Sequence, residues 1–421
     1  MASGSDIVPR PSPLKIVLPG NIAIPWSREI TAQLLLYVVW ANLVVMHFRA
    51  VFNRLPFFCN HIDEAMVFVF LVPVLLSLPA IINRFCLVDY LFYFLNVFYL
   101  LAGYAFFPEN ANFIDENILY CTFCVFTFYF IGRIVDIDHD FDALVLLSAI
   151  CIIVQVYYHA FYAPQNNVIS EAQREDNMWV AYQVTPHIAL ILWSMLEKFR
   201  IWKIALFVIG CVFILSCGSR GPLVCIGFFG IIYFFFYMQF KGAIYIKMFL
   251  ISLATLLVVK LNDTLFFLAR TFLDMKLSTR IIEKLVSGEI GNDSYRSSLR
   301  ARIYEVLNRD GHFWGLGPFG TRNYDIIYPH LLPLDFFATY GYVTGTLLLV
   351  LLCFLLGYSI WITRGRRAQI FIVFLSSLSI VKLMLSNTFL LEPYFYMLLG
   401  FCITVVLGMS NSPKTVADGK E

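Results

Sequence analysis

The chain has 421 residues, of which 60% are hydrophobic and only 14% are charged, and its mean hydropathy is +0.76. Soluble domains are on average about half apolar and about a quarter charged, so this composition excludes an ordinary soluble domain. The formal net charge of +2 gives no basic surface that would attract a nucleic acid. We therefore expect a helical membrane protein that crosses the bilayer many times and has no nucleic-acid partner.

The first segment, residues 1–30, contains five prolines, a pattern that interrupts helices. For the same reason we expect no cleavable signal peptide here. We predict that 1–30 is a cytoplasmic tail, that 31–408 forms one transmembrane domain, and that 409–421 is a second cytoplasmic tail.

Hydrophobic segments then follow one another along the chain, and a bilayer-spanning helix needs about 20 mostly apolar residues. Twelve can be drawn, at 31–47, 64–82, 87–107, 117–134, 142–161, 178–196, 202–217, 221–239, 244–261, 336–362, 368–385 and 390–408. We predict an all-α polytopic membrane protein with about 12 transmembrane helices. One large loop, 262–335, separates the ninth segment from the tenth and is expected to contain short helices.

The basic residues indicate which side each loop occupies. If the N-terminus is cytoplasmic, fifteen lysines and arginines lie in cytoplasmic loops and tails, against four in the short outer loops: Arg49, Arg54, Arg174 and Arg220. Short loops rich in Lys and Arg stay in the cytoplasm, whereas loops above about 60 residues cross largely regardless of charge. We predict that both termini are cytoplasmic and that loop 262–335 faces outward.

The most polar part of this loop begins at Ser294, which is suited to cap a helix over roughly 295–308. Leu299, Ile303 and Leu307 recur at helical spacing and should form one apolar stripe.

The same helix carries three arginines. Arg296 and Arg300 are four residues apart and share a face, whereas Arg302 points elsewhere. Gly315 and Gly317 follow, and we predict a tight turn in which another group approaches the backbone.

Three residues are candidates for chemistry at the outer face. A guanidinium is always charged and binds phosphate oxygens through two hydrogen bonds, which suits Arg220 and Arg300. The alternatives are an interfacial turn for Arg220 and a solvated helix face for Arg300. His330 lies between Pro329 and Pro333, where it is either a general base, since imidazole titrates near neutral pH, or a cap of the turn.

Several other polar residues have weaker claims. Arg174 lies in a predicted outer loop, and Asp335 is a second candidate base. Lys382 and Glu392 fall in or near predicted helices, and we interpret both as structural. The histidines and cysteines do not show the spacing of metal ligands, so we predict neither a metal nor a cofactor.

These motifs resemble those of the bacterial O-antigen polymerase and O-antigen ligase superfamily in their order, their spacing and the side of the membrane on which they are expected. Members of that superfamily are inner-membrane glycosyltransferases with a large periplasmic loop late in the chain. The matching positions are Ser219-Arg220-Gly221, Arg300 with Tyr304 four residues on, Gly315-Leu316-Gly317, and His330 with Gly341 eleven residues on. The chain departs from the family at Leu331, where an Asn usually follows the histidine.

The resemblance implies a metal-independent, inverting transfer of sugars carried on undecaprenyl pyrophosphate, at the periplasmic face of the bacterial inner membrane. It implies that His330 is the catalytic base and that Arg220, Arg300 and Arg302 bind the pyrophosphate. Arg296, Tyr304, Arg174 and Asp335 are then candidate substrate contacts.

Two members of the superfamily differ in their acceptor. A polymerase joins lipid-linked repeat units in lipopolysaccharide biosynthesis and works beside a chain-length regulator, whereas a ligase transfers the polysaccharide to lipid A-core. The Phe-rich chain and Leu331 favour a polymerase. The alternative outside this class is a transporter or flippase for a polar solute, but no repeat symmetry is visible in the sequence.

Overall fold

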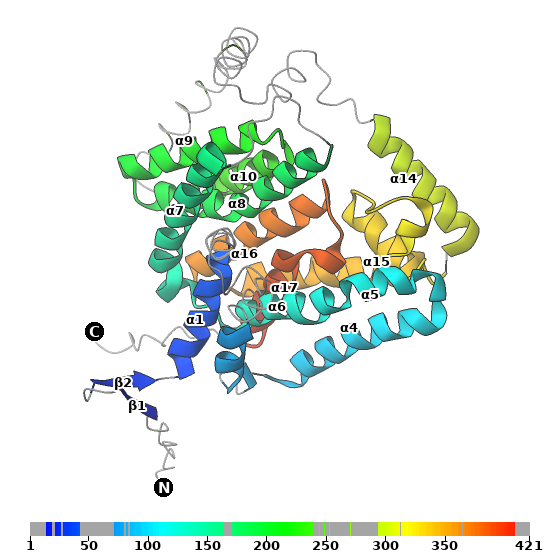
Figure 1. Cartoon of the computed structure of the whole chain (residues 1–421), viewed down its shortest axis with the longest axis horizontal. Coiled ribbons are helices and arrows are strands. Elements are labelled where there is room, and N and C mark those ends of the chain that lie inside the picture. The colour runs from blue at the N-terminus through cyan, green and yellow to red at the C-terminus, as the bar shows by residue number, and fades with distance from the viewer. Residues whose placement is uncertain are drawn as a thin grey trace.

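The computed structural model describes residues 14–18, 22–26, 28–42, 71–79, 81–82, 85–162, 171–238, 294–311, 313–363 and 365–408, with isolated positions between 244 and 270. Within these ranges the regular secondary structure is helical apart from one hairpin near the start of the chain (Figure 1). The described part therefore confirms a predominantly helical fold.

The hairpin is the departure from the all-α prediction. Strands β1 (Leu14–Leu18) and β2 (Ile22–Trp26) pair antiparallel, with Leu14 opposite Trp26 and Leu18 opposite Ile22. The strands fall inside the segment 1–30. Its prolines argue against a helix, but the branched side chains between them favour extended backbone.

The helices follow the predicted hydrophobic segments closely. In chain order they are α1 (Arg28–Trp40), α4 (Leu87–Phe106), η1 (Pro108–Asn110), α5 (Ala111–Leu119), η2 (Tyr120–Cys124), α6 (Val125–Ile134), α7 (Ile137–Tyr162), α8 (Glu171–Glu197), α9 (Ile201–Ser216), α10 (Gly221–Ile232), η3 (Tyr233–Tyr237), α14 (Ser294–Val306), η5 (Leu307–Gly311), η6 (Gly320–Tyr324), α15 (Leu332–Ile362), α16 (Arg366–Ser376), η7 (Ser377–Val381), η8 (Phe389–Leu391) and α17 (Pro393–Val406). Prolines occupy the first turn of α10, α15 and α17, where their missing N–H leaves no helical bond unmade.

Four helical stretches are long and apolar enough to cross a membrane: Leu87–Phe106, Pro108–Ile134, Ile137–His159 and Leu332–Ile362. Three shorter apolar helices accompany them, Ile201–Ser216, Gly221–Tyr237 and Pro393–Val406. These helices are consistent with a membrane protein, whereas the total of twelve spans stays a prediction. The predicted span 244–261 lies almost entirely outside the described residues.

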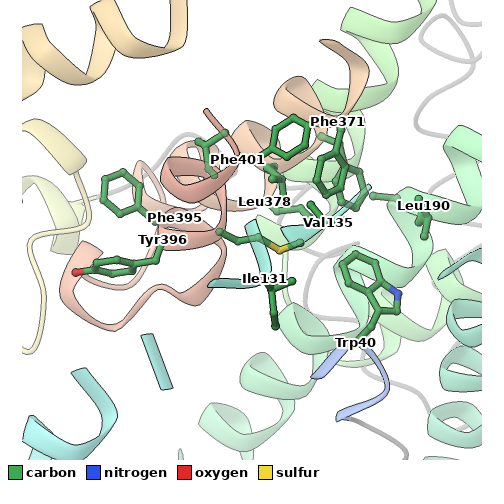
Figure 2. Packing of buried hydrophobic residues seen from close by; sticks show 14 of the residues in the cluster. Trp40, Ile131, Val135, Leu190, Phe371, Leu378, Phe395, Tyr396 and Phe401 are labelled. Carbon is green, nitrogen blue, oxygen red and sulfur yellow. The ribbon is translucent and has the colours of Figure 1, made fainter. Parts of the chain in front are cut away.

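The core of the bundle lies where α6, α8, α16 and α17 meet, and Figure 2 shows Ile131, Leu190, Phe371 and Phe401 converging from these helices. α6 and α17 make the closest contact. A Cβ atom at Gly132 would collide with the Met397 carbonyl, and the symmetric clash at Gly400 would be with Tyr129. Small residues permit this approach of two backbones, as is typical of membrane helices.

The bundle has two polar ends. We refer to the first as the Arg133 end, where α6 and α8 finish and α16 begins; there Arg367 forms a 3.1 Å ion pair with Glu197. The second is the α14 end, formed by α14, η6, the first turns of α5, α15 and α17, and residues 382–392. There Asn110 donates a 2.8 Å hydrogen bond to the Leu316 carbonyl. The hairpin and α14 lie on opposite sides of the molecule (Figure 1).

Candidate functional site

Helix α14 spans Ser294–Val306 and continues as one π-helical turn to Gly311, close to the predicted 295–308. The predicted apolar stripe is confirmed: Ile303 and Leu307 are buried and belong to one cluster with Leu334 and Ala338 of α15. Leu299 packs against the edge of that cluster. The stripe fixes the helix against the bundle, so the position of its arginines is also fixed.

The glycine turn meets a break in α15. Gly341 has φ of 79° and ψ of 170°, which no L-residue adopts easily, and the helix kinks there. The Leu316 N–H donates a 2.6 Å hydrogen bond to the Ala338 carbonyl. A Cβ atom at Gly315 would lie 2.6 Å from the Thr339 carbonyl oxygen, so this close approach requires glycine. The kink thus holds the loop on the membrane domain.

His330 is held in an unusual conformation at the start of α15. Its φ is 56°, in the left-handed region that non-glycine residues rarely occupy. Its Nδ1 lies 3.1 Å from the Leu385 carbonyl oxygen. Because a carbonyl can only accept, Nδ1 must carry the hydrogen, and Nε2 is then the basic nitrogen of the neutral ring. The Tyr328 ring contacts the imidazole edge-on, with centroids 4.5 Å apart.

Arg300 reaches His330 from α14. Its Nη2 donates a 3.1 Å hydrogen bond to the His330 carbonyl, which stabilises the left-handed backbone. Its Nε is buried and has no hydrogen-bond partner. Arg300 therefore positions the histidine and keeps a donor for a ligand. Strained residues of this kind cluster at functional sites.

A buried ion pair lies on the segment that also holds His330. Lys382 Nζ is 2.6 Å from Glu392 Oε2, and Asn387 donates a 2.8 Å hydrogen bond to the same oxygen. The ammonium also lies 5.0 Å from the centre of the Tyr182 ring, in cation–π range. From the sequence we interpreted Lys382 and Glu392 as structural. The signal that could have singled them out is the presence of two charged residues in or near apolar segments.

Tyr182 of α8 links this pair to the beginning of α10. A Cβ atom at Gly221 would collide with the Tyr182 hydroxyl, so Arg220, the preceding residue, lies beside it at the N-terminus of α10. The charges of Arg296 and Glu392 both act on the same hydroxyl. The structure therefore places Arg220 beside Tyr182, and the charge of Arg296, which is distant in sequence, acts on the same hydroxyl.

Two of the predicted arginine-helix residues point away from this cluster. The Arg302 side chain is 51% exposed, and it contacts the exposed Asp325 at 4.0 Å. Tyr304 is 40% exposed. They are two residues apart, so they point to different sides of α14, and both side chains are exposed instead of packing with the buried stripe.

The remaining candidates have other surroundings. Asp335 is buried in the first turn of α15, where its Oδ2 accepts a 2.9 Å hydrogen bond from the Phe389 N–H and so holds η8 in place. Arg174 belongs to α8, but its side chain lies outside the described residues.

A further arginine of this end was not singled out by the sequence. Arg322 of η6 packs between the rings of Phe113 and Phe319, at 5.7 and 5.0 Å, and lies 3.6 Å from Glu116. Its Nε is buried without a hydrogen-bond partner. Burial lowers the pKa of this guanidinium, and the Glu116 carboxylate opposes that shift. No spacing rule would find it, because its neighbours come from distant helices.

The fold and the site together describe a helical protein with apolar helices long enough to span a membrane and a cationic site at one end of its bundle. No family model, no curated protein and no solved structure matches the chain. Any functional conclusion must therefore depend on these residues and their geometry.

Proposed function

We propose that the chain is a metal-independent, inverting glycosyltransferase that acts on oligosaccharides linked to undecaprenyl pyrophosphate, and specifically an O-antigen polymerase of the bacterial inner membrane. The observation that carries this proposal is the contact between Arg300 and His330. An oriented imidazole beside a partly buried guanidinium combines a base with an anion-binding group.

The arginines provide the positive charge that the leaving group requires. Negative charge develops on the pyrophosphate as its bond to the sugar breaks, and preorganised donors stabilise it without reorganisation. Arg300 contributes its unpaired Nε, and Arg220 and Arg296 lie around Tyr182 at the same end. Because Arg302 is exposed, the proposed clamp consists of Arg220 and Arg300, with Arg296 as their neighbour.

His330 supplies the base. Its Nδ1–H is held by the Leu385 carbonyl, which directs Nε2 as the proton acceptor. In the proposed reaction Nε2 takes the proton of an acceptor hydroxyl. The hydroxyl oxygen then bonds to the anomeric carbon, and the bond to the pyrophosphate oxygen breaks with its electron pair. A single displacement of this kind inverts the anomeric configuration.

The acceptor decides between polymerase and ligase. Leu331 beside His330 and the 42 phenylalanines of the chain favour the polymerase, whose acceptor is a second lipid-linked oligosaccharide. A chain-length regulator would then be its protein partner. Incubation of the purified protein with lipid-linked repeat units, with and without lipid A-core, separates the two. Longer chains without lipid A-core support the polymerase, whereas transfer to lipid A-core alone identifies a ligase.

His330→Ala tests the mechanism. General-base catalysis contributes about 10²–10⁴-fold, so turnover should fall by that factor while the yield of folded protein is unchanged. In the wild type the rate should decrease as the pH falls and the imidazole protonates, and this acid limb should be missing in the variant. His139→Ala is the matched control, since His139 is an exposed histidine of the Arg133 end. Ordinary turnover with an unchanged pH profile in His330→Ala would mean that the base lies elsewhere.

A further inference from the structure

The buried pair of Lys382 and Glu392 has no part in the reaction described above. Glu392 is fully buried, at 0% exposure, and the Lys382 side chain is 15% exposed. Both known partners of the carboxylate, Lys382 Nζ and Asn387 Nδ2, bind the same oxygen, Oε2. Oε1 is buried and has no hydrogen-bond partner.

An unpaired carboxylate oxygen in a buried position is costly, because it has lost its water without gaining a donor. Native structures rarely leave such an atom unless a ligand or a water completes it. Here the other oxygen is fixed by two donors, so the carboxylate cannot rotate to share them without breaking one bond. Oε1 therefore keeps an unused acceptor position that a ligand hydroxyl or an ordered water would fill.

The position of Glu392 places it within the candidate site. Residues 382–392 form one connection, and the same connection supplies the Leu385 carbonyl that orients His330. At its other end the charge of Glu392 acts on the Tyr182 hydroxyl, beside Gly221 at the start of α10. Glu392 is thus linked through Lys382 to Tyr182, which touches the start of α10, and it shares its connection with the carbonyl that holds His330.

The chemistry of Oε1 selects the kind of group it takes. It can only accept a hydrogen bond, and its negative charge repels a phosphate. The Glu392 carboxylate interacts electrostatically with the hydroxyls of three tyrosines, Tyr120, Tyr182 and Tyr394, so its surroundings are aromatic. The group must donate a hydrogen bond, carry no negative charge and pack on aromatic side chains. A sugar meets all three conditions, because it has neutral hydroxyl groups on a ring that can pack on aromatic side chains.

We propose that Glu392 is a substrate-binding residue whose Oε1 accepts a hydrogen bond from a sugar hydroxyl of the lipid-linked oligosaccharide, with Lys382 and Asn387 as its positioning residues. This inference rests on the proposed function, since it assigns the sugar half of the same substrate. The arginines bind the pyrophosphate half, and Glu392 distinguishes a sugar-bearing lipid from the bare lipid.

The experiment compares two probes: undecaprenyl pyrophosphate alone, and the same lipid carrying the repeat unit from cells that make this protein. The variant is the double replacement Lys382→Met with Glu392→Met, because exchanging a whole buried ion pair for apolar side chains is often neutral for stability. Thermal unfolding verifies that it is folded. Asp325→Asn, which removes an exposed carboxylate of the same end, is the control.

The double variant should bind the sugar-bearing lipid about 10- to 100-fold more weakly, the loss expected for one hydrogen bond to a charged group. Its affinity for bare undecaprenyl pyrophosphate should not change, and Asp325→Asn should match the wild type with both probes. Glu392→Gln, which keeps the shape, should show a smaller loss in the same direction.

The outcomes separate the two proposals. If the wild type binds neither lipid, the proposed function is wrong and this inference falls with it. If the wild type binds both lipids equally, or if the double variant keeps the full preference for the sugar-bearing lipid, Glu392 is only the counter-ion of Lys382, and the proposed function is unaffected.

Discussion

The two ends of the bundle hold buried charge in opposite ways. At the Arg133 end, Arg133 Nε and Nη2 lie 2.7 and 3.0 Å from the two oxygens of Asp89, and Nη1 donates to Thr404 at 2.8 Å. Tyr129 and the backbone N–H of Cys86 donate to the same carboxylate. All three guanidinium nitrogens and both carboxylate oxygens have partners, as in a structural ion pair.

The α14 end is different. Among the described residues, the buried side-chain nitrogens and oxygens that have no hydrogen-bond partner are Arg300 Nε, Arg322 Nε and Glu392 Oε1, and all three are at this end. Each such atom destabilises the fold by about 1–3 kcal/mol. Within the described part of the chain, buried charges are paired at the Arg133 end, whereas three atoms are left unpaired at the α14 end, and this difference supports the proposal that the α14 end binds a ligand.

The largest expected effect concerns the side of the membrane that each end faces, because a cysteine is either labelled or not labelled from one side. Asp325→Cys at the α14 end should react with a membrane-impermeant thiol reagent added outside intact cells stripped of their outer membrane. Lys198→Cys, exposed at the Arg133 end, should react only after the inner membrane is opened. The reverse pattern would overturn the orientation. Labelling of both from one side would show that the two ends do not face opposite compartments.

The next largest effect concerns stability at the Arg133 end. Asp89→Asn leaves Arg133 as an uncompensated buried charge, so unfolding in detergent should become easier by about 3–5 kcal/mol. Arg300→Met is the contrasting variant. It breaks the hydrogen bond to His330 and should cost about 1 kcal/mol. Equal losses in the two variants would remove the distinction between a structural end and a functional one.

Catalytic activity, unlike stability, should depend most on the arginines of the α14 end. Arg300→Lys and Arg220→Lys keep the positive charge but lose the planar guanidinium, which binds phosphate through two hydrogen bonds. Both variants should therefore lose glycosyl-transfer activity. Loss of one preorganised donor costs about 2–4 kcal/mol of transition-state stabilisation, which is measured as kcat/KM with lipid-linked repeat units. Activity should persist in excess chelator, since the proposed clamp consists of arginine side chains. Full activity in both lysine variants, or a strict requirement for a divalent ion, contradicts the clamp.

The sequence predicted the parts of the fold that depend on local pattern. The apolar segments that fall within the described residues are helical, and the stripe through Ile303 and Leu307 was confirmed because helical spacing alone determines which residues share a face. The hairpin within 1–30 was missed, since its strands are only five residues long and lie among prolines. Both glycines of the loop were singled out, but not their contact with the kink at Gly341.

The site was only partly predictable, for a physical reason. Arg300 and His330 were recognised from their residue types, whereas their contact joins α14 to the start of α15 and depends on packing. Lys382 and Glu392 are ten residues apart and come together only because the chain turns between η7 and α17. Burial decides which charges remain unpaired, and no pattern of residues reports burial atom by atom.

The smallest expected effect lies within α14 itself and sharpens the comparison to a single helix. Arg296 acts on Tyr182, whereas Arg302, six residues later, is 51% exposed and touches only the exposed Asp325 among the ion pairs of the described chain. An exposed ion pair contributes about 0–1 kcal/mol. Arg302→Ala should therefore lower the free energy of unfolding by no more than about 1 kcal/mol and change kcat/KM by no more than about fivefold. Arg296→Ala should lower kcat/KM more than Arg302→Ala does, with a similar free energy of unfolding, because it removes the cation whose charge acts on Tyr182.

The two variants differ only in the face of α14 from which a guanidinium is removed. If Arg302→Ala has the larger effect, the substrate approaches over the exposed face of α14, and the pyrophosphate clamp must be extended to the residue that the sequence first placed there.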